Sequence, residues 1–170
     1  MFNFDAVVPS IPYILEGIGV TLQIVVGATI IGLVLGILLA LCKIGNIAPL
    51  RWFASFYTSI FRGTPLVLQL MLIYYAVPQV LDMQIDPIPA AILAFGLNSG
   101  AYISEIIRAG ISAVDKGQME AAKALGIPYG KMMKDIILPQ AMKNILPSLM
   151  NEFITLNKES AIVTVIGAMD

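Results

Sequence analysis

The sequence has almost none of two residue types that carry much enzyme chemistry: it has no histidine, and Cys42 is its only cysteine in 170 residues. This excludes a disulfide framework, thiol–imidazole catalysis and the usual ligand sets of zinc and haem sites. There is also no Gly-x4-Gly-Lys-Ser/Thr phosphate loop in the sequence. We therefore expect no cofactor in this chain and no enzymatic activity of its own.

Charge is scarce too, because charged residues make up 12% of the chain against roughly 25% in soluble proteins. Hydrophobic residues make up 58%, and the mean hydropathy is +0.87. These values predict an integral membrane protein of the all-α class, a polytopic helical bundle in contact with lipid. The ten basic residues are spread along the chain between apolar runs, so no nucleic-acid partner is expected.

Apolar runs long enough to cross a membrane recur along the chain, since a spanning helix needs about 20 residues. We predict a single domain over residues 1–170, with spans at about 18–41, 57–80, 88–113 and 136–156. Pro139 and Pro147 remove backbone donors from the last of these and predict bends in it. The apolar stretch 161–169 is too short to cross, so a fifth span is expected after Asp170.

The distribution of basic residues predicts the orientation of these spans. Nine of the ten flank the connections between spans one and two and between spans three and four, and Lys158 is the exception. Because lysine and arginine favour the cytoplasmic side, these connections should be cytoplasmic. The N-terminus should then lie outside the cytoplasmic membrane.

Several polar side chains fall at membrane depth, where they are costly and usually line a pathway or the bundle interior. The candidates for a substrate pathway are Asn98, Ser99, Glu105, Asn151 and Glu152. Asn98 and Ser99 could equally form helix-to-helix hydrogen bonds. Glu105 lies three residues before Arg108, on the same helix face, and an internal ion pair is favoured there.

A stripe of small residues runs along the first predicted span at every fourth position. Its members are Ala28, Gly32, Gly36 and Ala40, called here the small-residue stripe. It predicts a helix-packing face. The partner could be another helix of the same bundle or a second subunit.

The polar connection between spans three and four has the signals of a short capped helix. Asp115 and Gln118 have the spacing of a capping box, while Gly126 and Pro128 provide a stop and a new start. We predict a cytoplasmic helix over about 116–125. Its small side chains suit docking to another protein better than resting on lipid. The candidate contacts are Glu120, Ala121, Ala122, Lys123, Leu125 and Gly126.

These motifs carry a resemblance that covers nearly the whole chain. Glu120-Ala121-Ala122 to Gly126, followed by Ile137-Leu138-Pro139, resembles the EAA motif in the permease subunits of ATP-binding-cassette (ABC) importers. Residues 61–66, 101–111 and 156–160 resemble the polar amino acid uptake group, which includes glutamine, histidine, arginine and cystine permeases.

The resemblance implies a coupling helix at 116–125 seated in a groove of an ABC ATPase subunit. It further implies an ATPase dimer that holds ATP and magnesium, a second permease subunit, identical or homologous, and an extracytoplasmic amino-acid-binding protein. Polar amino acids would then cross by alternating access. The alternative hypothesis is an ATP-independent channel or ion-coupled carrier; a membrane enzyme ranks third, because Glu105 and Glu152 have no nucleophile–base pair beside them.

Overall fold

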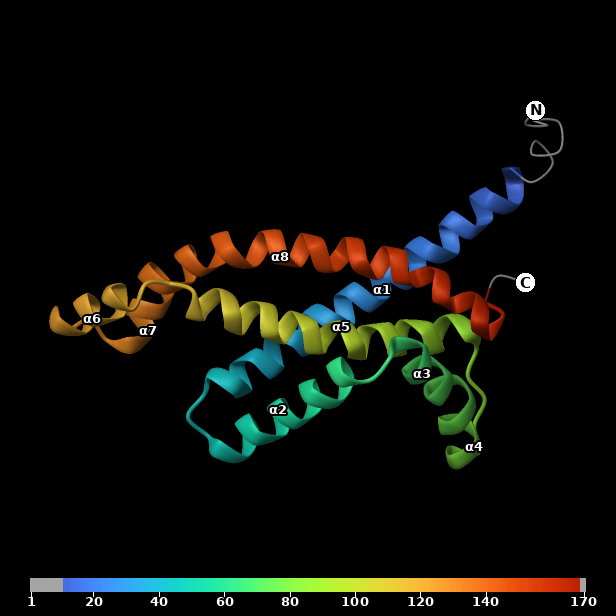
Figure 1. Ribbon diagram of the computed structural model, residues 1–170, viewed down its shortest axis with the longest axis horizontal. Helices are drawn as coiled ribbons and strands as arrows, with labels where there is room; N and C mark the ends of the chain where they lie inside the picture. The colour runs from blue at the N-terminus through green and yellow to red at the C-terminus, as the bar shows by residue number, and fades with distance from the viewer. Residues whose placement is uncertain (1–10, 169–170) are drawn as a thin grey trace.

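The computed structural model describes residues 11–168, and every regular element in that part of the chain is a helix. The all-α prediction is therefore confirmed. The long helices are α1 (Ile11–Ile44), α2 (Ala48–Gly63), α5 (Pro87–Ser112) and α8 (Leu138–Glu159) (Figure 1). Shorter elements connect and end them: α3 (Leu66–Met71), η3 (Leu72–Ala76), α4 (Val77–Leu81), α6 (Lys116–Ala124), α7 (Tyr129–Met132), η4 (Met133–Ile137) and η5 (Ser160–Ile166).

Helix α5 is the centre of the bundle and contacts α1, α2, α3 and α8. Pro87 stands in its first turn, where a missing N–H breaks no intrahelical bond. Its buried side chains are mostly small, with Phe95 the largest that is fully enclosed. Figure 1 shows α1 crossing α5 along much of its length.

The small-residue stripe of α1 packs against α5. A Cβ atom at Gly36 would lie only 2.7 Å from the Cβ of Ile103. Small residues of α5 receive α1 in return, since a Cβ at Gly96 would lie 2.8 Å from the Cβ of Ile31. The predicted packing face is confirmed, and among the described residues its partner is a helix of the same chain.

The second predicted span, 57–80, is not one straight helix, and this expectation is corrected. Helix α2 ends at Gly63, and the helix pair Ala48–Gly63 and Leu66–Leu81 is bent by 105°. The cause is Pro65, which disfavours the helical conformation of the residue before it. Thr64 is accordingly extended, with φ −116° and ψ 143°.

Within residues 11–168, two helices, Leu15–Ile44 and Pro87–Ser112, are long and apolar enough to cross a membrane, and the bent pair could provide a third span. The fourth predicted span, 136–156, largely coincides with α8. Helix α8 is long enough to cross a membrane, but its described residues are not apolar enough by mean hydropathy. Lys143, Asn151 and Glu152 lower that mean hydropathy. The expected fifth span lies outside the described residues.

Wide π-helical turns precede two prolines. Turn η3 ends just before Pro78, and η4 ends just before Pro139. In a regular α-helix the proline ring would meet the carbonyl four residues earlier, and a π turn moves that carbonyl away. Pro147 lies inside α8 without such a turn. Near Pro139, where the sequence predicts a bend, the structure thus has the π-helical turn η4, which lies before the proline.

Candidate functional site

Polar side chains of α5 and α8 meet inside the bundle. The Ser99 hydroxyl donates a hydrogen bond of 3.0 Å to a carboxylate oxygen of Glu152. Ser99 is 1% exposed, and Glu152 is partly buried. Two of the predicted pathway residues, 53 positions apart in sequence, are thus brought into direct contact.

A polar stripe on α8 leads away from this pair. Asn144, Ser148 and Glu152 recur at every fourth position and therefore share one helix face. Asn144 and Ser148 line a hollow of about 430 Å³ between α5 and α8, on which Glu105 and Arg62 of α2 also border. Neither was among the predicted pathway residues, although their regular spacing from Glu152 is visible in the sequence.

Asn98 has a different environment from Ser99, its neighbour. Its side-chain amide donates to the backbone carbonyl of Phe61 at 3.1 Å and to the side-chain oxygen of Gln69 at 3.0 Å. Gln69 in turn donates to the Phe61 carbonyl at 2.9 Å and to the Thr64 carbonyl at 3.1 Å. Together Asn98 and Gln69 satisfy carbonyl groups that the break between α2 and α3 leaves without helical partners.

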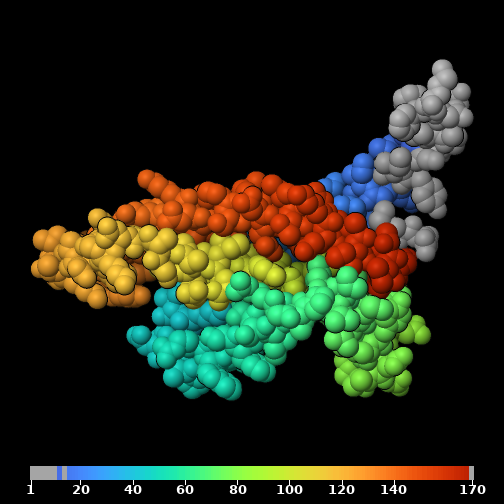
Figure 2. All heavy atoms as spheres, in the orientation of Figure 1, coloured from blue at the N-terminus to red at the C-terminus, as the bar shows by residue number. Residues whose placement is uncertain are grey.

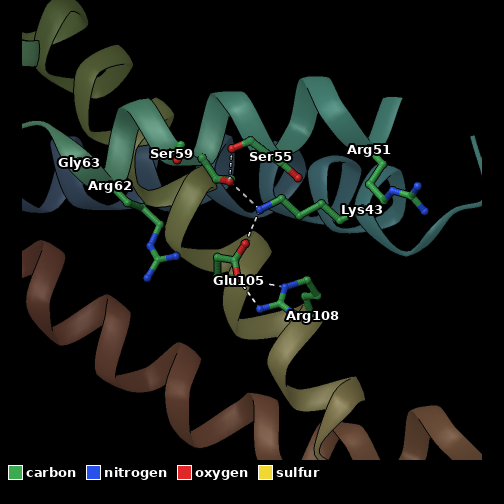
Figure 3. Close-up of a pocket in the computed structure, with 9 residues that line it drawn as sticks. Lys43, Arg51, Ser55, Ser59, Arg62, Gly63, Glu105 and Arg108 are labelled. Atoms are coloured by element: carbon green, nitrogen blue, oxygen red, sulfur yellow. Dashed lines mark hydrogen bonds and ion pairs between the residues drawn. The ribbon is translucent and has the colours of Figure 1, made fainter. Parts of the chain in front are cut away.

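Glu105 lies between two basic side chains, as Figure 3 shows. One carboxylate oxygen accepts from the Lys43 ammonium, and the other accepts from Arg108 at 2.8 and 3.0 Å. The Lys43 side chain is 5% exposed and also donates to the Thr58 hydroxyl at 2.6 Å. The predicted ion pair with Arg108 is confirmed. Lys43, 62 positions earlier in sequence, is a second partner that the sequence did not predict.

Asn151, the remaining pathway candidate, does not join these groups. It is exposed on α8, one residue before Glu152 and therefore turned about 100° from it. Within residues 11–168, no three histidine, cysteine, aspartate or glutamate side chains gather as metal ligands would.

The helix predicted over 116–125 is α6, Lys116–Ala124. Its N-cap at Asp115 and its stop at Gly126 are as predicted, but the capping box is not completed, because the hydrogen bond that the Gln118 side chain makes among the described residues is with Gln140 and not with the Asp115 N–H. The Asp115 carboxylate accepts from the Gly117 N–H at 2.7 Å. At the other end the Ile127 N–H reaches the Ala122 carbonyl and the Gly126 N–H reaches the Lys123 carbonyl, both at 3.0 Å. This is a Schellman motif, and Gly126 provides its left-handed residue with φ 70°.

The six predicted docking residues divide into two groups by exposure. Ala122 is 2% exposed and packs into a cluster with Met132, Ile137 and Ala141. It therefore anchors α6 to its own chain. The other five are exposed: Glu120, Ala121, Lys123, Leu125 and Gly126.

Helices α6 and α7 stand at one end of the elongated molecule, beyond the ends of α1 and α2 (Figure 1), and Figure 2 shows their outer surface projecting there. Leu125 is 78% exposed at this end. Leu125 and the exposed charged residues Glu120 and Lys123 therefore give this end of the chain both apolar and charged groups at its surface.

Comparisons with known proteins agree on one family. Residues 32–169 match the model of the binding-protein-dependent transport system inner membrane component family. The chain is 66% identical to the arginine transport system permease protein ArtQ of Bacillus subtilis, over 99% of this chain and 77% of that protein. It is 57% identical to a protein of Rickettsia prowazekii provisionally named glutamine transport system permease protein GlnP, over 95% of this chain and 74% of that one.

A solved structure extends the similarity to three dimensions. A chain in the crystal structure of an amino acid ABC transporter with histidines matches this chain with 46% sequence identity. The match has a TM-score of 0.95 and covers all of this chain and 79% of that one.

Proposed function

The chain belongs to the binding-protein-dependent transport system inner membrane component family, and we propose that it is the permease subunit of an ATP-driven importer of polar amino acids. One observation carries this proposal. Sequence and fold match an amino acid ABC transporter over the whole chain, with 46% identity and a TM-score of 0.95. The named relatives are permease proteins of arginine and glutamine transport systems.

In this proposal α6 is the coupling helix, and its exposed residues contact an ATPase subunit on the cytoplasmic face. Glu120, Lys123 and Leu125 are available to a partner, while Ala122 ties the helix to the cluster at the end of α5 and α8. Movement of a docked α6 would therefore pass to α7, η4 and α8. The EAA motif corresponds to this anchored and capped unit.

The orientation of the chain in the membrane follows from the proposed cytoplasmic position of α6. If α6 meets a cytoplasmic ATPase, the N-terminal end of α1 lies outside, because α1 and α5 each cross once and α2 to α4 form the broken span between them. The basic residues flanking α6 and the turn between α1 and α2 agree with this orientation.

The solute pathway is proposed to run along the facing surfaces of α5 and α8. Ser99 and Glu152 form its polar contact, with the hollow bordered by Asn144 and Ser148 leading toward α6. A carboxylate and a hydroxyl can bind the ammonium group that every amino acid carries. Asn98, Asn151 and Glu105 remain candidate contacts, although Asn98 and Glu105 already have partners within the chain.

The partners follow from the proposed assembly. A second permease subunit, identical or homologous, would complete the pathway, and an extracytoplasmic binding protein would deliver the amino acid. ATP and magnesium would be held by the ATPase pair. The structural feature that favours this assembly over an ATP-independent channel or ion-coupled carrier is α6, since a carrier has no use for a projecting capped helix.

Reconstitution in lipid vesicles tests the proposal. The full-length subunit is purified with its candidate ATPase and supplied with amino-acid-loaded binding protein, with either ATP or an ion gradient as the energy source. Uptake is expected only with ATP, and Glu120→Arg should keep the subunit inserted but abolish ATPase association. Uptake driven by the ion gradient alone, with no bound ATPase, would support the carrier.

A further inference from the structure

A hollow with a surplus of positive charge lies where the end of α1 meets α2 and α5. Its volume is about 680 Å³ (Figure 3). Four basic side chains and one carboxylate line it, so the charged lining has a net charge of +3. The charged lining residues are Lys43, Arg51, Arg62, Arg108 and Glu105.

The positions of the cations are held by contacts within the chain. Lys43 is fixed by Glu105 and Thr58, and Arg108 is fixed by the other oxygen of Glu105. The Arg62 guanidinium lies 5.3 Å from the centre of the Tyr102 ring, within the range of a cation–π contact. Three of the four basic groups are therefore preorganised around an open space.

Helix α2 supplies hydroxyl groups and the fourth cation. Arg51, Ser55, Ser59 and Arg62 follow one another at intervals of three or four residues, so they share one helix face. Serine hydroxyls can donate hydrogen bonds to an anion. In residues 11–168 the Arg51 side chain has no hydrogen bond or ion pair, so a ligand can bind it without breaking an internal contact.

The next face of α2 is strongly apolar. Trp52 is 75% exposed, and Phe53, Phe56 and Ile60 are exposed beside it. An exposed tryptophan such as Trp52 favours the boundary between lipid and water, and the phenylalanine and isoleucine side chains beside it suit hydrocarbon. A ligand in the hollow therefore has an anion site and a surface for hydrocarbon on adjoining faces of a single helix.

We propose that this hollow binds the phosphate of an anionic phospholipid head group, with the acyl chains lying along the aromatic face of α2. Guanidinium groups suit phosphate because their donors can bind two of its oxygens at once. A zwitterionic amino acid fits less well, since its ammonium group would face the same surplus of positive charge. The site does not include Ser99 or Glu152, although it shares Arg62 and Glu105 with the hollow bordered by Asn144 and Ser148. It does not rest on the direction or energy source of transport.

Native mass spectrometry of the full-length subunit tests this site. The protein is equilibrated with equal amounts of phosphatidylglycerol and phosphatidylcholine that carry identical acyl chains. Wild-type protein should retain phosphatidylglycerol preferentially. Because each basic residue near anionic lipid contributes on the order of fivefold in binding, Arg51→Gln should reduce the preference by about that factor, and Arg51→Gln with Arg62→Gln should reduce it further.

The matched control is Lys116→Gln with Lys131→Gln, which removes two exposed cations outside the hollow and should keep the wild-type preference. Arg51→Gln should not disturb the fold, since the Arg51 side chain has no hydrogen bond or ion pair among the described residues. A loss of lipid preference in this variant therefore reports on binding. Equal loss in the control pair, or no preference in the wild type, would overturn the proposal. Displacement of phosphatidylglycerol by inorganic phosphate at constant ionic strength would assign the hollow to soluble phosphate instead.

Discussion

The hydroxyl of Ser99 donates to the carboxylate of Glu152 at 3.0 Å and thereby joins α5 to α8 inside the bundle. The hydroxyl needs only one of the two carboxylate oxygens. The second oxygen has no hydrogen-bond donor among the described residues, so Glu152 retains capacity to bind a cationic group. This pair is the basis of the first prediction.

Glu152→Gln should lower uptake of the amino acid roughly ten- to hundredfold, because a hydrogen bond from its ammonium group to a charged carboxylate is worth about 1.5–3 kcal/mol. The amide can still accept from Ser99, so folding should be unaffected. Initial uptake rates in vesicles at low arginine concentration measure the effect, and membrane abundance is the control. Unchanged uptake rates would mean that Glu152 only joins α5 to α8 through Ser99 and does not contact the solute.

Asn98→Ala should destabilise the subunit by about 1–3 kcal/mol, because the Gln69 side-chain oxygen loses its donor and the Phe61 carbonyl loses one of two. Thermal unfolding of the purified subunit measures this loss. A double-mutant cycle with Gln69→Ala should give a coupling energy of about 0.5–3 kcal/mol. If Asn98→Ala lowers uptake while the thermal stability and the coupling energy with Gln69 stay unchanged, then Asn98 contacts the solute and does not stabilise the break between α2 and α3.

Gly126→Ala should weaken binding of the ATPase about tenfold, because a side chain in the left-handed region costs about 1–2 kcal/mol and disturbs the end of α6. Co-purification at graded ATPase concentrations measures the effect. Gly130→Ala is the matched control, since an added Cβ meets no atom within 4 Å at either glycine and Gly130 lies within α7. Equal binding by both variants would argue against the coupling assignment.

Glu105→Gln should destabilise the subunit by on the order of 3 kcal/mol, because the nearly buried Lys43 ammonium loses its counterion. Thermal unfolding at constant detergent concentration reports the change. Lys43→Met combined with Glu105→Met should recover most of the loss, since both charges are then removed. A double variant as unstable as Glu105→Gln would mean that shape and not charge decides this contact.

Helices α1 and α5 were predictable because length and apolar composition suffice for them. Helices α1 and α5 follow directly from their hydrophobic runs, and the caps of α6 follow from Asp115 and Gly126. The break in the second span was not predicted, although Arg62, Gly63 and Thr64 interrupt the apolar run there and Pro65 disfavours a helical conformation of the residue before it. A count of apolar residues cannot detect a change of direction.

The candidate sites were predictable by residue type but not by partner. Ser99 and Glu152 stand out as polar groups in apolar runs, yet their contact depends on the packing of α5 against α8. Lys43 served only to orient the chain, whereas the structure brings it to Glu105 across the α1–α5 contact. Such pairings depend on tertiary packing, which periodicity along one helix does not report.

The π-helical turn at Met133–Ile137 also makes chain length a determinant of orientation. A π turn holds one residue more than the α-helical path it replaces, and each residue of an α-helix rotates the chain by roughly 100°. Deleting one residue in η4 would therefore turn α6 and α7 about the axis of α8 and point Glu120 and Leu125 in another direction. Substitutions can alter what this surface binds, but the residue count between Ala122 and Pro139 decides where the surface faces.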